Sequence, residues 1–211
     1  MKTTKKIIKN SDEHDSSIKP SLNESAIILV SGLPRSGTSM MMRMLEAGGM
    51  DLLVDHIRKA DEDNPKGYYE FEKIKKIKKD SSWLESSYGK AVKVVSMLLY
   101  QMPEHKKYKV IFIKRDMSEI LASQKKMLER RGQPTGRVND HVMAMKFNAH
   151  LMKLFKWLDE QENMLTHFVS YNDVISDPME QSRRINRFIG NRLEVDKMVN
   201  VVDSSLYRQR R

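Results

Sequence analysis

The chain contains no cysteine and no long apolar run. Without cysteine it has no disulfide, no thiolate ligand for zinc and no thiol nucleophile. That composition fits the reducing cytoplasm, and we expect a cytoplasmic protein. No run approaches the roughly 18 apolar residues of a membrane-spanning helix, so we expect no membrane span. The lysine-rich start of the chain also lacks the apolar segment of a secretory signal.

Acidic residues are in the minority, with 28 Asp and Glu against 38 Lys and Arg and a net charge of +10. A basic balance favours a polyanionic ligand, such as nucleic acid, an anionic membrane or a phosphorylated nucleotide. The sequence has no basic stripe interleaved with aromatic residues and no recognisable nucleic-acid module, so we expect no nucleic-acid partner. No group of Asp, Glu and His has the spacing of a metal site, and we expect no metal.

A glycine-bounded loop follows the first apolar strand, with the sequence Gly32-Leu33-Pro34-Arg35-Ser36-Gly37-Thr38-Ser39. A loop between a strand and a helix binds phosphate through converging backbone N–H groups and the positive end of the helix dipole. The spacing from Gly32 to Gly37 is that of a P-loop, but Thr38 replaces the P-loop lysine, and the cation of the loop is Arg35. Because that lysine contacts the β- and γ-phosphates, the loop suits an anion other than a magnesium-bound triphosphate.

Short apolar segments alternate with amphipathic ones along the chain. The pattern predicts strands at residues 26–31, 91–95, 110–114 and 166–171, and helices at residues 38–47, 70–79, 116–131, 138–161 and 177–190. Alternating strands and helices indicate a parallel sheet. We therefore predict an α/β fold with three layers, α/β/α, a central mostly parallel sheet and P-loop NTPase-like topology. Residues 1–24 are polar and are expected to form a disordered leader to a single domain at residues 25–211.

Three further segments stand out beside the loop at residues 34–39. They are Asn64-Pro65-Lys66-Gly67-Tyr68-Tyr69-Glu70, then Ile113-Lys114-Arg115-Asp116 with Ser123 eight residues after Arg115, and Ser170-Tyr171-Asn172-Asp173-Val174 followed by Asp177-Pro178 and Phe188-Ile189-Gly190. In this order the four segments resemble the motifs of sulfotransferases that use 3′-phosphoadenosine-5′-phosphosulfate (PAPS), and the first of the three is similar to a segment of small bacterial members. Asn172 replaces the usual Glu of the last motif. The resemblance spans about residues 26–190 and implies transfer of a sulfuryl group from PAPS to a hydroxyl or amine, with PAP as the product.

The resemblance also implies roles for particular residues. Arg115 would bind the 3′-phosphate through its guanidinium, with a hydroxyl hydrogen bond from Ser123. The alternative for Arg115 is an ion pair with Asp116 or Glu119. Arg35 would stabilise the charge that develops on the leaving phosphate. The 5′-phosphate would be bound by the other loop residues, namely Ser36, Gly37, Thr38 and Ser39.

Sulfuryl transfer also needs a base for the acceptor's proton. In the cytosolic branch of the family this base is a His two residues after a Lys. Here Lys93 matches the Lys and is a candidate second cation, but Val95 stands at the His position. The carbohydrate branch uses a Glu after the first helix, and Glu70 matches it best, with Glu72 in reserve. The alternative for Glu70 is a carboxylate that complements a helix N-terminus.

Two other functions remain open from the sequence. A P-loop kinase of a small metabolite would need a lysine at position 38 and an acidic magnesium ligand at a strand end, for which Asp116 is the nearest candidate. The second alternative is a non-catalytic protein that binds PAP or PAPS.

For a sulfotransferase, the acceptor would be a small molecule or carbohydrate in a pocket built by residues 49–69 and 132–142, with His56 and Arg58 as candidate lining residues. Because the chain is short for the family, a homo-oligomer that completes the pocket is also open.

Overall fold

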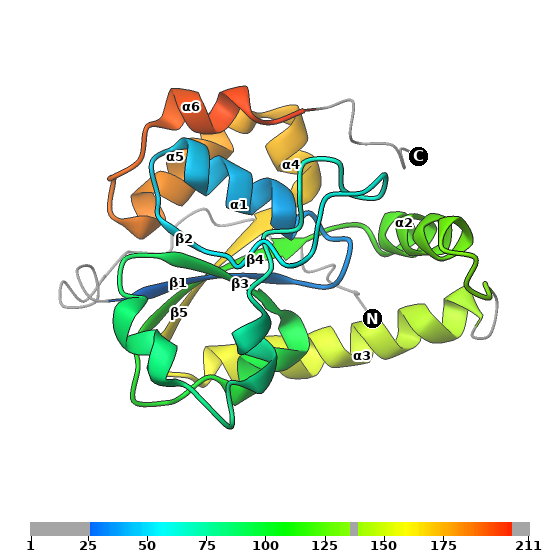
Figure 1. Cartoon of the computed structure of the whole chain (residues 1–211), viewed down its shortest axis with the longest axis horizontal. Coiled ribbons are helices and arrows are strands. Elements are labelled where there is room, and N and C mark those ends of the chain that lie inside the picture. The colour runs from blue at the N-terminus through cyan, green and yellow to red at the C-terminus, as the bar shows by residue number, and fades with distance from the viewer. Residues whose placement is uncertain (1–25, 136–138, 204–211) are drawn as a thin grey trace, which may run out of the picture.

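The computed structural model describes residues 26–135 and 139–203, and the expected leader at residues 1–24 lies outside them. Within the described residues, five parallel strands form one sheet in the order β2-β3-β1-β4-β5 (Figure 1). The strands are β1 (Ile27–Gly32), β2 (Leu52–Leu53), β3 (Ala91–Val95), β4 (Tyr108–Lys114) and β5 (Met164–Ser170). The predicted α/β class with a parallel central sheet is confirmed.

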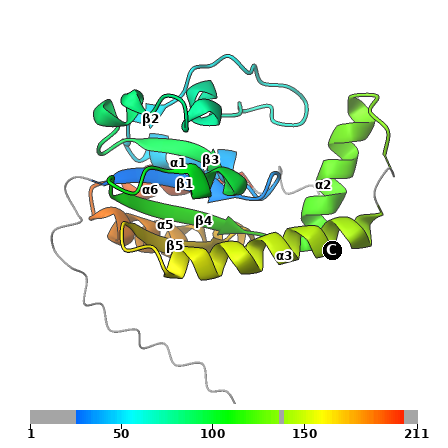
Figure 2. The ribbon, with the colours of Figure 1, turned by 90° about the horizontal axis from the view of Figure 1, so that it is seen from below.

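Helices cover both faces of the sheet (Figures 1 and 2). One face carries α1 (Thr38–Ala47), α4 (Tyr171–Ser176), α5 (Pro178–Ile189) and α6 (Val195–Asn200). The other carries α3 (Asp140–Asp159) and the 3-10 helices η2 (Glu72–Lys76), η3 (Ser82–Ser86) and η4 (Ser96–Gln101). Helix α2 (Met117–Arg130) extends beyond the carboxyl ends of the strands, where it meets the start of α3.

Strand β1 is buried on both faces, because it lies in the middle of the sheet. Its side chains alternate between the two hydrophobic cores, as the period of a strand requires. Ile28 and Val30 pack in the core beside α1, whereas Ile27 and Leu29 pack in the core beside α3. This position explains the uniformly apolar sequence of the strand.

The expected helix at residues 70–79 is wrong, because the structure has only the five-residue η2 there. Two isoleucines of this segment, Ile74 and Ile77, are buried and lie three positions apart, a spacing that suits the three-residue turn of a 3-10 helix. Lysines occupy most of the remaining positions, and like charges one turn apart disfavour a longer helix.

Candidate active site at the carboxyl ends of the strands

A cavity of about 450 Å³ lies where β1, β3 and β4 end. Its walls come from the loop after β1, from β3, from α2 and from the segment at residues 58–70. In an open parallel sheet this edge is the usual place for a ligand. The cavity brings together eight of the nine predicted site residues, namely Arg35, Gly37, Thr38, Ser39, Glu70, Lys93, Arg115 and Ser123.

The loop before α1 presents backbone donors to this cavity. Gly37 is the N-cap of α1 and has a φ of 106°, and no side chain caps the helix. A Cβ at this position would collide with the ring of Tyr171, so the close packing of the loop on α4 also requires glycine. The first N–H groups of a helix have no partner within it, and here they lie at a cavity wall. This arrangement can hold an anion.

Ser36 is the one predicted loop residue that does not line the cavity. Its side chain is buried against Gly32, and among the described residues its hydroxyl has no hydrogen-bond partner. The hydroxyl is therefore buried beneath the loop surface and does not line the cavity.

Arg35 and Arg115 are joined in one network beside α2. Arg35 Nε donates a hydrogen bond to Ser123 Oγ at 2.9 Å, and Arg115 Nη1 donates to the backbone carbonyl of Arg35 at 3.1 Å. Burial lowers the pKa of Arg35, and the nearby Arg115 lowers it further, while Asp63 and Tyr68 oppose this. The two cations predicted to serve separate anions are thus held side by side.

The open alternative for Arg115 is present in the structure as an ion pair with Glu119, at 2.8 Å between Nε and Oε2. Both side chains are buried, with exposed fractions of 8% and 5%. A guanidinium has five N–H donors, so this pair leaves the role in phosphate binding open. Asn172 Nδ2 donates to the other oxygen of Glu119 at 3.3 Å. A Glu at position 172, as in the family motif, would face Glu119 with a like charge.

Lys93 and Glu70 also line this cavity. Lys93 Nζ donates to Ser39 Oγ at 3.1 Å and to the carbonyl of Tyr68 at 2.8 Å. Burial lowers the pKa of Lys93 to about 8, with Arg58 and Arg35 acting in the same direction and Glu70 opposing them. Glu70 pairs with Arg58 at 2.7 Å, and the guanidinium of Arg58 lies 3.3 Å from the centre of the Tyr68 ring.

Neither carboxylate considered as the base sits at the start of a long helix. Glu70 precedes η2 by two residues, so its partner is Arg58 rather than a helix N-terminus. Glu72 pairs with Lys75 at 2.5 Å and does not line the cavity. The structure therefore brings Glu70, and not Glu72, to the predicted site residues.

The sulfotransferase domain family matches residues 26–211 of the chain. The chain belongs to the sulfotransferase domain family. Among solved structures it is similar to sulfotransferase STF1 from Mycobacterium tuberculosis H37Rv, with a TM-score of 0.53, 15% identity and coverage of 89% of this chain and 78% of that chain. It is also similar to the sulfotransferase domain from the curacin biosynthetic pathway, with a TM-score of 0.51, 16% identity and coverage of 85% and 78%.

At these identities the solved structures show a shared fold, whereas the family match supports sulfotransfer as the activity. The resemblance found from the sequence motifs is thereby confirmed at the level of the family. No curated protein sequence matches this chain. In residues 26–135 and 139–203 of this sulfotransferase, no helix is both long and apolar enough to cross a membrane. The same residues contain no group of three or more His, Asp and Glu side chains that would hold a metal ion.

Sequence reasoning missed a cluster of charges that closes the sulfotransferase cavity. Asp63, whose side chain is 5% exposed, accepts from Arg130 Nη1 at 3.0 Å and pairs with Arg131 Nε at 3.5 Å. Its backbone carbonyl accepts from Arg35 Nη2 at 3.2 Å. Asp63 therefore connects the segment at residues 58–70 to α2 and to the loop that carries Arg35. No local spacing signals this contact, because the partners lie 67 residues apart in the chain.

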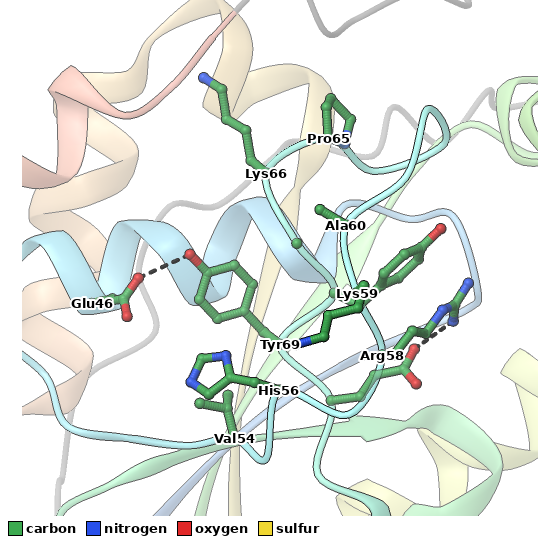
Figure 3. A pocket seen from close by; sticks show the side chains of 12 residues that line it. Glu46, Val54, His56, Arg58, Lys59, Ala60, Pro65, Lys66 and Tyr69 are labelled. Carbon is green, nitrogen blue, oxygen red and sulfur yellow. Dashed lines mark hydrogen bonds and ion pairs between the residues drawn. The ribbon is translucent and has the colours of Figure 1, made fainter.

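A second cavity of about 430 Å³ shares Arg58 and Glu70 with the first as lining residues, and Figure 3 shows the side chains that line it. His56 and Tyr69 line it and have positive φ angles of 54° and 55°, which is rare for residues other than glycine. Burial raises the pKa of Tyr69 to about 12, and its hydrogen bond to Glu46 contributes. Of the two loops predicted to build the acceptor pocket, residues 49–69 contribute most of this lining, whereas residues 132–135 and 139–142 line neither cavity. Which cavity takes the acceptor stays a prediction.

Proposed function

We propose that this protein transfers a sulfuryl group from PAPS to a hydroxyl or amine acceptor. The observation that carries the proposal is that one cavity gathers Arg35, Lys93 and Arg115 at the start of α1. PAPS has a 5′-phosphosulfate and a separate 3′-phosphate, so its site needs two groups of cations and N–H donors. The start of α1 with Lys93 suits the first anion, and Arg115 with Ser123 suits the second.

In the proposed reaction Glu70 takes the proton from the acceptor hydroxyl or amine. The acceptor atom then forms a bond to sulfur while the bond from sulfur to the bridging phosphate oxygen breaks. Arg35 and Lys93 stabilise the negative charge that develops on the phosphate of PAP. The ion pair with Arg58 holds the Glu70 carboxylate at the boundary of the two cavities, within reach of both substrates.

The donor assignment is tested by calorimetric titration with PAP, ADP and ATP, each with and without magnesium. We expect PAP to bind much more tightly than ADP, independently of magnesium, and the Arg115→Ala variant to lose this preference. The matched control is Lys153→Met, an exposed cation of α3 outside the cavity. Magnesium-dependent binding of ATP without preference for PAP would overturn the proposal and favour the kinase.

The base is tested separately, with the Glu70→Gln variant and with Glu72→Gln as its control. We expect Glu70→Gln to abolish sulfate transfer from radiolabelled PAPS while PAP affinity stays close to that of the parent protein. Unchanged transfer, or an equal loss of PAP affinity, would remove Glu70 from this role. Transfer to no acceptor despite tight PAP binding would favour the non-catalytic alternative. The cytoplasmic location and the homo-oligomer remain predictions from the sequence.

A further inference from the structure

The second cavity contains two basic side chains without a partner. Its other charged lining groups are engaged: Arg58 pairs with Glu70 at 2.7 Å, Lys66 with Asp203 at 2.8 Å, and Glu46 accepts from the Tyr69 hydroxyl at 2.9 Å. Within the part of the chain that the structure describes, Lys59 and His56 have neither a hydrogen bond nor an ion pair. In Figure 3 the Lys59 ammonium and the His56 ring both extend toward Tyr69, while Glu46 lies at the far end of the Tyr69 side chain from Lys59.

The backbone that carries His56 is held in place. The Asp55 carboxylate accepts from the N–H groups of Ile57 at 3.1 Å and Glu72 at 2.6 Å, and the Asp55 N–H donates to the Glu70 carbonyl at 3.2 Å. These bonds fix the segment on both sides of His56 although its φ is unfavourable. Unfavourable backbone angles that the surroundings enforce are concentrated at binding and catalytic sites. These hydrogen bonds therefore hold the segment that carries His56 as a fixed part of the cavity lining next to Glu70.

We infer that this cavity takes the acceptor, and that the acceptor is a small hydroxylated anion. The inference rests on the proposed function, because it places the acceptor hydroxyl at Glu70. Its anionic group, a carboxylate or a phosphate, accepts hydrogen bonds from the Lys59 ammonium and the His56 ring, two groups that have no partner among the described residues. A volume of about 430 Å³ lies in the range of pockets that bind single small molecules.

The test uses four pyranoses that differ at one position: glucose, glucuronamide, glucuronate and glucose 6-phosphate. Each is titrated by calorimetry into the protein saturated with PAP. We expect at least one of the two anions to bind about tenfold or more tightly than glucose and glucuronamide, as one charge-assisted hydrogen bond provides. The ratio of glucuronate to glucose 6-phosphate distinguishes a carboxylate from a phosphate. Equal affinities for charged and neutral sugars, or no binding by any of them, overturns the inference.

The site within the protein is tested by Lys59→Met and His56→Gln, with Lys75→Met on η2 as the matched control outside both cavities. The first two variants should lose the preference for the anion, whereas PAP affinity and the control should not change. If both Lys59→Met and His56→Gln still prefer the anionic sugars over the neutral ones, the anion does not bind at these residues and the proposed location is wrong. PAP is titrated into each variant first, before the sugars are added. An absence of PAP binding in that step contradicts the proposed donor, whereas PAP binding without anion preference contradicts only the acceptor class.

Discussion

Replacing Lys93 by methionine should make the protein more stable near neutral pH while weakening donor binding. Lys93 has its pKa lowered from 10.5 to about 8, chiefly by burial. Keeping the buried charge with this lowered pKa costs about 3 kcal/mol of free energy near neutral pH. The hydrogen bonds to Ser39 and the Tyr68 carbonyl, worth about 1 kcal/mol net, would be lost. The expected net stabilisation is therefore about 2 kcal/mol.

The stability gained by Lys93→Met is expected to depend on pH. Between about pH 8 and 10.5 the unfolded chain keeps the Lys93 proton while the folded protein releases it. The unfolded state then binds more protons, so the free energy of unfolding rises with pH in this window. Methionine has no such contribution. The advantage of Lys93→Met should therefore be largest near pH 7 and should disappear near pH 10.

Urea unfolding of both proteins near pH 7 and near pH 10 measures these differences. Lys153→Met, at an exposed position of α3, is the control and should change stability little at either pH. A Lys93→Met variant that is less stable than the parent near pH 7, or whose stability difference does not change with pH, would refute the reasoning. PAP titration of the same samples should show affinity reduced by about tenfold or more, because a charged contact is lost.

Three further predictions concern the walls of the donor cavity. Gly37→Ala should destabilise the protein by about 2 kcal/mol in thermal unfolding, because its φ is 106° and the new Cβ would collide with Tyr171. Ser36→Ala should leave PAP affinity within about twofold, since its hydroxyl lies beneath the loop; a tenfold loss would assign that hydroxyl to the phosphate. Asp63→Asn should open the segment at residues 58–70 to limited proteolysis, by weakening its two arginine pairs on α2; unchanged cleavage contradicts the tie.

The sequence was sufficient for the strands that form the centre of the sheet, because residues buried on both faces leave an apolar run. It placed the start of β4 at Val110 instead of Tyr108, because Lys109 interrupts that run. Lys109 is nevertheless 2% exposed, and its ammonium donates to the Phe188 carbonyl at 2.8 Å. A buried lysine satisfied by a distant carbonyl has no local signature.

Short elements were missed for a different reason. Helices α4 and α6 have six residues each, too few for a helical period to stand out. The sequence showed Ser170-Tyr171-Asn172-Asp173-Val174 as a motif but not as a helix. The helix is capped at its start by Ser170, whose hydroxyl oxygen accepts a hydrogen bond from the Asp173 N–H. Here tertiary packing against α5 and the loop at Gly37 supports a helix that would be marginal alone.

The candidate site also has one part that the sequence predicted and one part that it did not. The phosphate loop and the spacing of Arg115 and Ser123 are local patterns, and the sequence placed these residues together correctly at one sheet edge. The tie through Asp63 and the pairing of Glu70 with Arg58 depend on how the segment at residues 58–70 folds over the cavity. That segment is irregular, so no period or cap predicts where its side chains lie.

The charges lining the donor cavity connect stability to binding. Eight Lys and Arg side chains line it against three Asp and Glu, so the cavity is strongly positive before any ligand enters. Burial lowers the pKa of Lys93 to about 8, with a smaller contribution from Arg58 and Arg35, so keeping this charge in the cavity wall costs free energy. Under the proposed function an anionic donor relieves that cost, and its binding is expected to stabilise the folded protein. A lysine kept for structure alone would lower stability when replaced, whereas Lys93→Met should raise stability and weaken binding together. The opposite signs of these two changes at one residue therefore distinguish a ligand site from a structural cluster.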